Sequence, residues 1–551
     1  MREIDDNILA YHIGHDSGIA YKEGDTYTAI QTERIRVKRY SNLTKNYPVA
    51  WKGNNTSILQ AFQEYLQHKK YTIVMPVFAF YNWHLHPANV RAVVDSIHTR
   101  MGDAFIKGST HHAYHAGAGF YSSPFDKAIV ITTDGGGDGE YLTISYADRE
   151  TGIEQLETIQ RNLGGLYITG CSYCNEVQGG DLTWSGKGMG LVARGKKILP
   201  HLYDMLTKFY REKTQVNFRG SVAGTHQKVN FHDYARSTLG SKLIKDVEKE
   251  SNLEGKYVTK GQYSYDIMFT TQKAFEDMFD EATEKWINKY SDLPIVLSGG
   301  CALNVLNNER IKNKYKRPVF VPSCPCDTGL AIGSVLLKAA PKEQVHIHNI
   351  GPKMYDIETL DAFVKKRNAT KVTDSEIVDL LQQGNIIGYA QGPIEVGPRA
   401  LGFRSILCDP SYPEMKEKIN KIKDREWWRP FAPACRKQDA EIYFDSINFD
   451  FMEFMSFAVK VKPEMVDAIP AVVHVDGSAR LQTVTKESND KFYELLTQWN
   501  KITGKHVLLN TSLNSWGDPI ANTIRQCMAI LDDTNLDYMV IDNFLFSNQP
   551  K

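Results

Sequence analysis

Two histidines and a later aspartate have the residue types and the spacing of a metal site. His111 and His115 stand four positions apart, so on a helix both imidazoles lie on one face and can reach the same ion. Asp134 follows the apolar, β-like run 128–133 and begins a glycine turn. A mixed set of histidine and carboxylate ligands suits iron, zinc or manganese better than calcium. The alternative is a pair of helix-surface histidines beside an ordinary hairpin turn.

The glycine turn after Asp134 is suited to holding phosphate oxygens. Its three consecutive glycines carry no Cβ, so their backbone N–H groups can approach an anion closely. Residues 9–21 contain a similar strand, glycine turn and strand around Asp16. Two such hairpins predict a duplicated nucleotide-binding fold like that of actin or the heat-shock chaperones, which holds its ligand between two halves.

Two later glycine-containing segments, 297–304 and 327–333, join a β-like run or loop to a predicted helix. Helix N-termini at such junctions favour bound phosphate or carboxylate. For any single glycine among them, tight packing of a strand against a helix is the simpler explanation.

Basic residues concentrate in the second half of the chain. From Arg399 to Arg436 nine basic residues stand against five acidic ones, and guanidinium groups match phosphate or carbamate oxygens in a bidentate way. Arg399, Arg404 and Arg429 lie among Pro, Leu, Phe and Trp residues, which favours burial around a ligand over a solvated basic face. The pattern predicts a polyanionic ligand such as a nucleoside triphosphate or an acyl phosphate.

The length and composition predict a protein of at least two globular domains. A chain of 551 residues exceeds what one hydrophobic core supports, and residues 338–352 have the proline and glycine content of a linker. We expect domains at residues 1–340 and 353–551, joined by residues 341–352. Lys and Arg (65) balance Asp and Glu (65), so no global field draws the chain to nucleic acid or membrane.

Cysteine usage and hydropathy predict a cytoplasmic protein. The eight cysteines are scattered through the chain, as reduced thiols are in a large cytoplasmic enzyme. No apolar run has the length of a secretory leader or a membrane span, so we expect no membrane partner.

Together these motifs resemble those of the O-carbamoyltransferases of the nodulation-factor and antibiotic-tailoring type. The resemblance runs from Gly14-His15-Asp16-Ser17 to Asn510-Thr511-Ser512, and its most specific parts are Gly397–Gly402, Arg429–Pro433 and His474–Gly477. It implies an α/β fold in two parts. An N-terminal actin-like, threonylcarbamoyl-transferase-like duplicated α/β domain would be joined to a C-terminal YrdC-like α/β domain.

The resemblance implies that the C-terminal domain carries out the first of two reaction steps. Carbamoyl phosphate and ATP would give carbamoyl adenylate and pyrophosphate there, with Mg²⁺ bridging the ATP phosphates. The residues implied for this site are Arg399, Arg404, Lys423, Arg429, Met455, Arg480, Ser512 and Asn514.

In the second step the resemblance implies carbamoyl transfer to an acceptor hydroxyl in the N-terminal domain. A metal ion, usually Fe(II), would be held by His111, His115, Asp134 and Asp327 and would stabilise charge on the adenylate leaving group. Either His15 or Asp16 is expected to take the hydroxyl proton. Expected adenylate contacts are Gly135, Gly136, Gly137, Lys187, Gly299, Gly300 and Asn304.

Two further positions are interpreted differently from their neighbours. His112 points about 100° away from His111 on a helix, so we expect it to pack or to face solvent. Ser185 stands where relatives of this type usually carry the glutamate of Glu-Gly-Lys-x-Met-Gly, which puts a role for that carboxylate in doubt.

The acceptor stays open between a small hydroxylated metabolite or sugar and a hydroxymethylated base in DNA. Residues 34–52 contain six basic residues, no acidic one and interleaved aromatics, and residues 310–317 form a second basic run. Such stretches can line a nucleic-acid groove, although an exposed basic loop explains them too. The oligomeric state is not predicted.

Three other functions share part of the pattern. An actin-fold carbohydrate kinase would explain the two hairpins but neither the histidine pair nor the second domain. A tRNA threonylcarbamoyl-type enzyme has both domain types but requires threonine and bicarbonate. A non-catalytic nucleotide switch would bind ATP and would release no pyrophosphate in response to carbamoyl phosphate.

Overall fold

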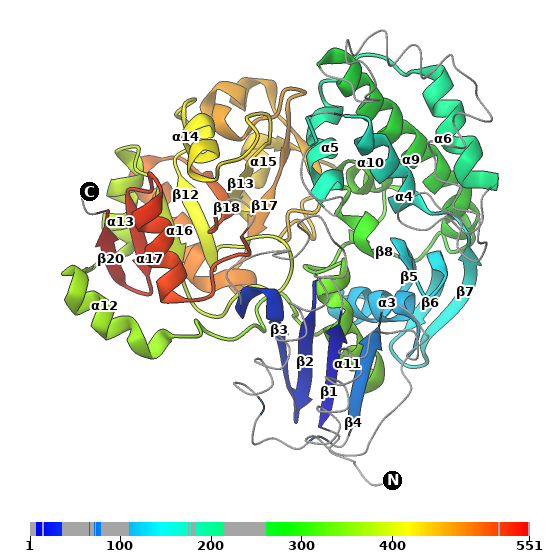
Figure 1. The fold of residues 1–551 in the computed structure, drawn as a ribbon, viewed down its shortest axis with the longest axis horizontal. Coiled ribbons are helices and arrows are strands. Elements are labelled where there is room, and N and C mark those ends of the chain that lie inside the picture. The colour runs from blue at the N-terminus through cyan, green and yellow to red at the C-terminus, as the bar shows by residue number, and fades with distance from the viewer. Residues whose placement is uncertain are drawn as a thin grey trace.

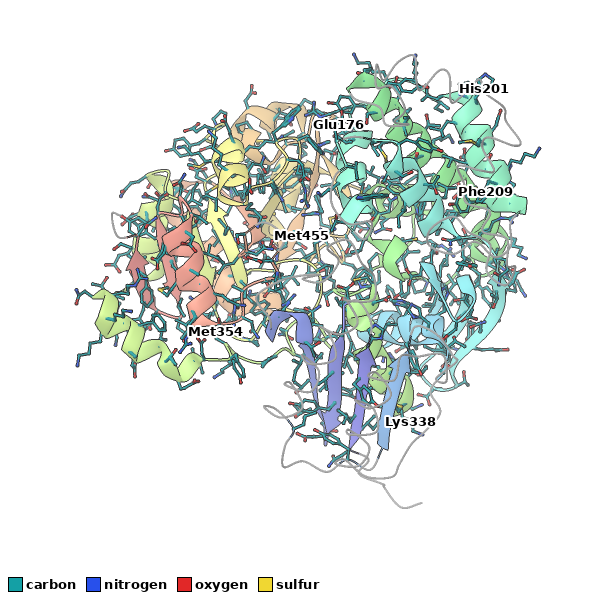
Figure 2. The ribbon with its side chains drawn as sticks, viewed as in Figure 1. Glu176, His201, Phe209, Lys338, Met354 and Met455 are labelled. Carbon is teal, nitrogen blue, oxygen red and sulfur yellow. The ribbon has the colours of Figure 1, made fainter. Side chains whose placement is uncertain are left out.

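The structure is a computed structural model, and it describes residues 7–13, 16–35, 66, 71, 73–78, 109–174, 176–177, 183–212, 261–515 and 518–548. The described residues form a mixed α/β protein with four sheets (Figure 1). Residues 7–340 are called the N-terminal half below and residues 353–548 the C-terminal half. Side chains from both halves lie along their common boundary, where Figure 2 labels Met455.

The N-terminal half contains two sheets that repeat one strand order. In each sheet a hairpin continues into a third antiparallel strand, and the first strand of the hairpin pairs in parallel with a later strand on its other side. The orders are β3-β2-β1-β4 and β7-β6-β5-β8-β9. The strands are β1 (Ile8–Ile13), β2 (Gly18–Glu23), β3 (Thr26–Gln31), β4 (Ile73–Phe78), β5 (Lys127–Gly137), β6 (Glu140–Asp148), β7 (Gly152–Ile159), β8 (Ile295–Ser298) and β9 (Val319–Phe320).

Two helices lie between these sheets. Helix α11 (Leu330–Ala339) packs against the first sheet and α3 (His111–Ser122) against the second, and the two helices pack against each other (Figure 1). Helix α3 begins after Thr110, whose side chain accepts a hydrogen bond from the Ala113 backbone N–H at 3.2 Å. The other face of the second sheet carries a helical layer of α4 (Leu163–Ser172), α5 (Trp184–Val192), α6 (Pro200–Glu212) and α9 (Gln262–Lys289).

Helices α3 and α11 cross closely because small residues meet at the contact. A Cβ at Gly333 would lie 2.1 Å from the Tyr114 carbonyl oxygen, and a Cβ at Gly117 would lie 2.8 Å from the Gly333 carbonyl oxygen. No side chain fits at either position, so the two helix backbones touch. This contact sets the distance between α3 and the segment that leads into α11.

The C-terminal half is built on an eight-stranded mixed sheet of order β10-β20-β19-β11-β12-β18-β13-β17. Helices α13 and α16 cover one region of it with a core that contains Leu381, Phe492 and Trp499. The strands are β10 (Thr370–Lys371), β11 (Ile387–Ala390), β12 (Arg404–Cys408), β13 (Ala432–Arg436), β17 (Gln482–Val484), β18 (Leu508–Ser512), β19 (Tyr538–Ile541) and β20 (Phe544–Ser547).

A smaller sheet and six helices complete this half. The three-stranded sheet is formed by β14 (Phe444–Asp445), β15 (Ala458–Val461) and β16 (Ser478–Arg480). The helices are α12 (Leu360–Arg367), α13 (Asp374–Gln382), α14 (Met415–Ile422), α15 (Ala440–Tyr443), α16 (Lys486–Thr503) and α17 (Ile524–Asp533).

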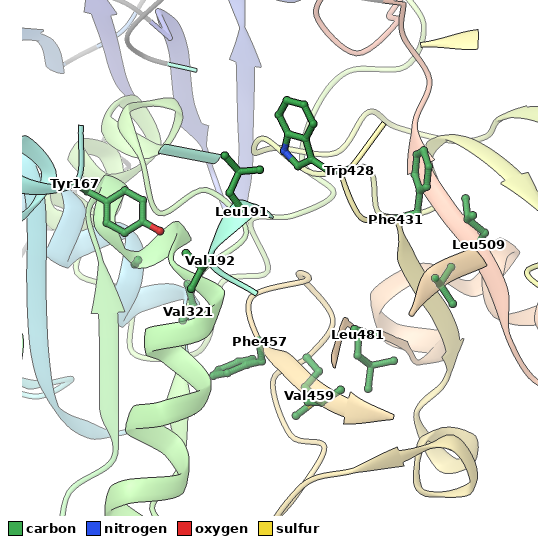
Figure 3. Packing of buried hydrophobic residues seen from close by; sticks show 14 of the residues in the cluster. Tyr167, Leu191, Val192, Val321, Trp428, Phe431, Phe457, Val459, Leu481 and Leu509 are labelled. Atoms are coloured by element: carbon green, nitrogen blue, oxygen red, sulfur yellow. The ribbon is translucent and has the colours of Figure 1, made fainter. Parts of the chain in front are cut away.

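The two halves share a hydrophobic core. One cluster of buried apolar side chains contains Leu191 of α5 together with Trp428 and Phe457 of the C-terminal half (Figure 3). The connecting residues 341–352 also contact both halves: the Val345 backbone N–H donates to Tyr121 at 3.0 Å, and the His348 carbonyl accepts from Val396 at 2.9 Å. The halves are therefore held in fixed contact along this boundary.

Substitution of the helix-crossing glycine tests this arrangement. Gly333→Ala should lower the melting temperature, because overpacking at a tight contact costs about 1–3 kcal/mol. Gly186→Ala is the matched control, since a Cβ there meets no atom within 4 Å and alanine favours a helix. Thermal unfolding followed by circular dichroism measures both variants, and equal melting temperatures for the two would contradict the close crossing.

Candidate functional site

Four side chains of the N-terminal half bring one ligand atom each to a common point. The atoms of His111, His115, Asp134 and Asp327 all lie within 4.8 Å of one another. The two Nε2 atoms are 3.0 and 3.2 Å from Asp134 Oδ2, and 3.4 and 3.5 Å from Asp327 Oδ1. A tetrahedral ion with bonds of about 2.1 Å separates its ligand atoms by about 3.4 Å. The spacing and the donor types fit a transition-metal ion.

Three separate elements position these ligands. Helix α3 places both imidazoles on one face, as the four-residue spacing predicts. Asp134 lies in β5, where the pairing with β6 is interrupted between Thr133 and Gly137. Its Oδ1 accepts backbone N–H groups of Gly135 at 2.7 Å and Gly300 at 3.3 Å, which directs Oδ2 toward the histidines. Asp327 begins the turn that leads into α11.

The glycines around the cluster are required by close contacts. A Cβ at Gly137 would lie 2.3 Å from the His111 ring, and one at Gly300 would lie 2.8 Å from Asp134 Oδ1. At Gly299, where φ is +85°, a Cβ would lie 2.3 Å from the Thr133 carbonyl oxygen. Close packing alone is therefore enough to explain why these positions are glycine. The role of these three glycines, and of Gly135 and Gly136, as adenylate contacts stays a prediction.

Electrostatics also favour a cation in this cluster. Burial lowers the pKa of His111, but the charges and hydrogen bonds of Asp327 and Asp134 outweigh it and raise the pKa to about 10. Burial alone would raise the pKa of the Asp134 carboxyl, whereas hydrogen bonds from both histidines lower it below its ordinary value. A metal ion bound here would replace the protons that the two carboxylates stabilise on the imidazoles.

Two residues near the cluster were not predicted from the sequence. His12, buried in β1, has its Nε2 3.9 Å from Asp327 Oδ2. Asp138 accepts the His111 backbone N–H at 2.9 Å and so adds a carboxylate at the start of α3. Asp138 belongs to the predicted hairpin and could have been proposed there. The position of His12 had no signal, because it depends on the placing of β1 beside the turn at Asp327.

The remaining predicted residues of the N-terminal half fall into different environments. Asp16 adopts a left-handed conformation (φ 56°) and lies near Cys326; burial and the charge of Asp16 raise the pKa of that thiol. His15 lies outside the described residues. Asn304 caps α10 (Val305–Tyr315) by accepting the Asn307 N–H and also bonds Gln272, so its polar atoms have structural partners.

His112 packs, as expected for a residue off the ligand face. It is buried, and its Nδ1 lies 3.3 Å from the Thr143 hydroxyl. Burial and the neighbouring His111 lower its pKa to about 3, so it is neutral at physiological pH.

The C-terminal half contains a second site with the opposite charge. Arg399, Arg425, Arg429 and Arg480 converge closely enough that burial and the other three guanidinium groups lower the pKa of Arg480 well below its ordinary value. Burial and Arg429 do the same to Arg425. Such a group of cations is stabilised by a bound polyanion, because the anion removes their mutual repulsion.

Lys423 lies at the end of α14 in a cluster with two other predicted residues. Its Nζ donates to the Ser512 carbonyl at 2.6 Å and to Asn514 Oδ1 at 2.5 Å, and the Ser512 hydroxyl bonds Asn514 Oδ1 at 2.7 Å. A cavity of about 430 Å³ lies beside the cluster and is lined in part by Asn514 and Lys421. Met455 is buried near the boundary, with φ at 57°.

The Arg404 side chain is bonded to backbone carbonyls and does not face open space. It is buried, and its guanidinium donates to the carbonyls of Gln391, Phe403 and Gly392. The Glu395 carboxylate accepts the backbone N–H groups of Leu401 and Arg404 at 2.9 and 3.2 Å. Arg404 thus stabilises the loop that carries Arg399, and the anion site is built from the other arginines.

That loop is also held by the N-terminal half. Arg34 donates to the carbonyls of Glu395 and Gly397, at 2.6 Å each. Gly397 has a φ of +125°, and a Cβ there would lie 2.1 Å from the Ser323 carbonyl oxygen. The position of Arg399 therefore depends on contact between the halves.

The structure gives no support to a nucleic-acid groove at residues 310–317. Arg310 forms a two-pronged ion pair with Asp280, and Lys314 pairs with the same carboxylate and with Glu284. Lys312 is buried against Glu309, and Arg317 donates to backbone carbonyls. These cations have acidic or carbonyl partners, largely on the adjacent α9, and offer little charge to a phosphate backbone. Residues 36–52 of the other basic stretch lie outside the described residues.

The metal ligands can be tested by metal retention. His115→Ala should weaken binding of Fe(II) or Zn²⁺ by more than about 100-fold, the upper range for changes in outer-shell partners alone. His112→Gln, on the same helix but off the ligand face, should keep the wild-type metal content. Elemental analysis after dialysis gives the metal per chain, and equal content in the two variants would remove His115 from the site.

The anion site predicts an unusual stability effect. A cation whose pKa is lowered in the folded state destabilises that state at neutral pH, so Arg480→Gln should raise the melting temperature of the ligand-free protein. The same variant should lose more than half of the thermal shift that pyrophosphate gives the wild type. Differential scanning fluorimetry measures both shifts, with the exposed Arg211→Gln as the control. A lower melting temperature with an unchanged pyrophosphate shift would contradict the anion site.

None of the helices in the described part of the chain combines the length and the apolar character that crossing a bilayer requires.

Comparison with protein families gives two matches: the family described as Carbamoyltransferase N-terminus matches residues 52–336, and Carbamoyltransferase C-terminus matches residues 378–548.

Among curated proteins, the chain is similar to Nodulation protein U of Sinorhizobium fredii. The identity is 36% over 74% of this chain and 72% of that protein. Nodulation protein NolNO of the same species is 26% identical over 97% of this chain and 79% of its own length. Among solved structures, HypF of T. kodakarensis covers 61% of this chain and 48% of that chain at 14% identity, with a TM-score of 0.31.

Proposed function

The chain belongs to the carbamoyltransferase family, and on that premise we propose that it is an ATP-dependent O-carbamoyltransferase with two reaction sites. The observation that carries the proposal is the coexistence of two oppositely charged sites in one chain. The arginine cluster is suited to a polyanion, and the histidine–aspartate cluster is suited to a metal cation.

The first step takes place at the arginine cluster. Carbamoyl phosphate and ATP, with Mg²⁺ on the ATP phosphates, give carbamoyl adenylate and pyrophosphate. Mass balance requires one water and releases one phosphate: carbamate forms first, and its oxygen then attacks the α-phosphorus of ATP. Arg399, Arg425, Arg429 and Arg480 stabilise the charge that spreads over the phosphate oxygens. Lys423, Ser512 and Asn514 position the nucleotide and the carbamate from the adjacent cluster.

The second step takes place in the N-terminal half. A divalent transition-metal ion such as Fe(II), held by His111, His115, Asp134 and Asp327, would supply positive charge to the adenylate phosphate. The acceptor hydroxyl attacks the carbamoyl carbon, the bond to the phosphate oxygen breaks and AMP leaves. Asp16, whose charge acts on Cys326 next to Asp327 in the chain, or His15 takes the hydroxyl proton. Gly299 and Gly300, which adjoin Thr133 and Asp134, stay expected contacts of the adenylate.

The proposal includes the fold of each half. Residues 1–340 form an actin-like, threonylcarbamoyl-transferase-like domain, and the repeated strand order of its two sheets supports this. Residues 353–551 form a YrdC-like domain, and residues 341–352 connect the two. The family matches, which lie on either side of the connecting residues, support these boundaries.

A small hydroxylated compound or sugar is the acceptor we propose. Two basic stretches suggested a polynucleotide acceptor, and in one of them, residues 310–317, Arg310 and Lys314 are paired with acidic side chains. An actin-fold carbohydrate kinase would explain the N-terminal half alone, and it would leave the arginine cluster of the C-terminal half without a role.

The division of labour can be tested by separating the two steps. Arg399→Ala should lower carbamoyl-phosphate-dependent pyrophosphate release by at least about 100-fold, the cost of removing one group that stabilises transition-state charge. His115→Ala should keep that release measurable and lose carbamoylated product. Pyrophosphate is assayed by a coupled enzyme that consumes pyrophosphate itself, because the step also releases phosphate, and product is assayed by mass spectrometry over a panel of hydroxyl compounds. Turnover of ATP and acceptor without carbamoyl phosphate would establish a kinase instead.

A further inference from the structure

One acidic side chain at the boundary between the halves contacts a cation from each half. Glu426 is in the segment between α14 and β13. Its Oε1 is 2.5 Å from the Nζ of Lys187 on α5, and its Oε2 is 3.7 Å from Arg429. The Lys187 side chain is 9% exposed and the Glu426 side chain 17% exposed, so water screens this pair weakly.

The ion pair belongs to a packed contact between α5 and residues 424–430. The Arg194 guanidinium lies 4.6 Å from the centre of the Trp427 ring, which is a cation–π distance. A Cβ at Gly190 would meet the Trp428 ring at 3.6 Å, and Leu191 shares a buried cluster with Trp428 (Figure 3). Aromatic side chains of one half thus cover the helix that carries Lys187 in the other.

The charges around Glu426 link this contact to both ligands. Burial raises the pKa of its carboxyl, but the hydrogen bond from Lys187 and the charges of Lys187 and Arg429 lower it, so the carboxylate is ionised. A phosphate on the arginine cluster would compete with Glu426 for Arg429. An adenylate phosphate in the N-terminal half would compete with it for Lys187. One carboxylate therefore responds to the anion in either site.

We propose that Glu426 is a positioning residue that couples the two sites, by holding Lys187 and Arg429 in place and keeping α5 closed against residues 424–430 while carbamoyl adenylate passes between them. This inference rests on the proposed function. Carbamoyl adenylate is a mixed anhydride, and water that reaches it gives carbamate and AMP, with loss of the carbamoyl group from the reaction. A closed contact at the boundary limits that loss.

The coupling is measured as carbamoylated product formed per pyrophosphate released. Glu426→Gln keeps the size of the side chain and removes its charge, and we expect the ratio to fall at least fivefold, with AMP formed in excess of product. Glu417→Gln is the matched control: Glu417 is an exposed residue of α14 that pairs with Lys421 at 2.8 Å. Its ratio should equal that of the wild type.

A double-mutant cycle distinguishes coupling from general disruption. Lys187→Gln should lower the ratio to a similar extent, and the double variant should be no worse than the poorer single variant, because both changes break one pair. Lys187→Arg, which retains the charge, should recover part of the ratio. A wild-type ratio in Glu426→Gln, or additive losses in the double variant, would overturn the inference.

Hydrogen exchange tests the contact without turnover. In Glu426→Gln, peptides from residues 184–192 and 424–430 should exchange faster than in Glu417→Gln. If the wild type shows no carbamoyl-phosphate-dependent pyrophosphate release, the proposed function fails and the coupling fails with it, whereas the exchange result tests separately whether Glu426 holds α5 against residues 424–430. Unchanged exchange in both segments would then overturn it as well.

Discussion

The close crossing of α3 and α11 is the constraint on which the metal cluster depends. Both histidines come from α3, whereas Asp327 comes from the turn at the start of α11, so the separation of the helices sets the distance between the ligands. Gly117 and Gly333 allow the two backbones to touch. A side chain at either position would push Asp327 away from Nε2 atoms that now lie 3.4 and 3.5 Å from it. Ligand geometry tolerates little error, so packing far from solvent controls the chemistry of the site.

The two sites have opposite electrostatic character, and this difference is what a reaction divided between them needs. In the N-terminal half carboxylates raise the pKa of His111 and prepare the cluster for a cation. In the C-terminal half neighbouring guanidinium groups lower the pKa of Arg480 and prepare the cluster for an anion. Under the proposed function, a nucleotide phosphate would be attracted to both, by arginines in one site and by a bound cation in the other. Glu426 lies at the boundary between the halves, where it is the acidic partner of Lys187 in one half and Arg429 in the other.

The parts of the site that the sequence predicts are those that depend on local spacing. The four-residue separation of His111 and His115 is sufficient to place them on one helix face, and a β-like run followed by glycines is sufficient to place Asp134 at a strand end. Asp327 and Arg480 were expected only through the family resemblance, because their contacts join distant elements. Glu426, which pairs with a residue of the other half, had no sequence signal.

The charge run at residues 310–317 could not be interpreted from the sequence for a related reason. Residues 310–317 are basic in sequence, but the acids that neutralise them, Asp280 and Glu284, lie on α9, which packs alongside. A count along the chain cannot register a partner that arrives through tertiary packing. Arg399 and Arg404 make the same point within one motif: Arg404 is occupied by backbone carbonyls, whereas Arg399 contributes to the field at Arg480.

The glycines of the N-terminal site are explained by close packing, and the same packing bears on how a phosphate could bind there. At Gly137 a Cβ would meet the His111 ring, and at Gly300 it would meet the Asp134 carboxylate, so each glycine lies against a metal ligand. The absence of a side chain that packing requires also brings the loop backbone within hydrogen-bond distance of the cluster. Gly300 already donates one of these groups to Asp134 Oδ1 at 3.3 Å. The contact that fixes the predicted ligands thus also brings the glycine backbone close to them, which is the arrangement that a phosphate-holding loop requires.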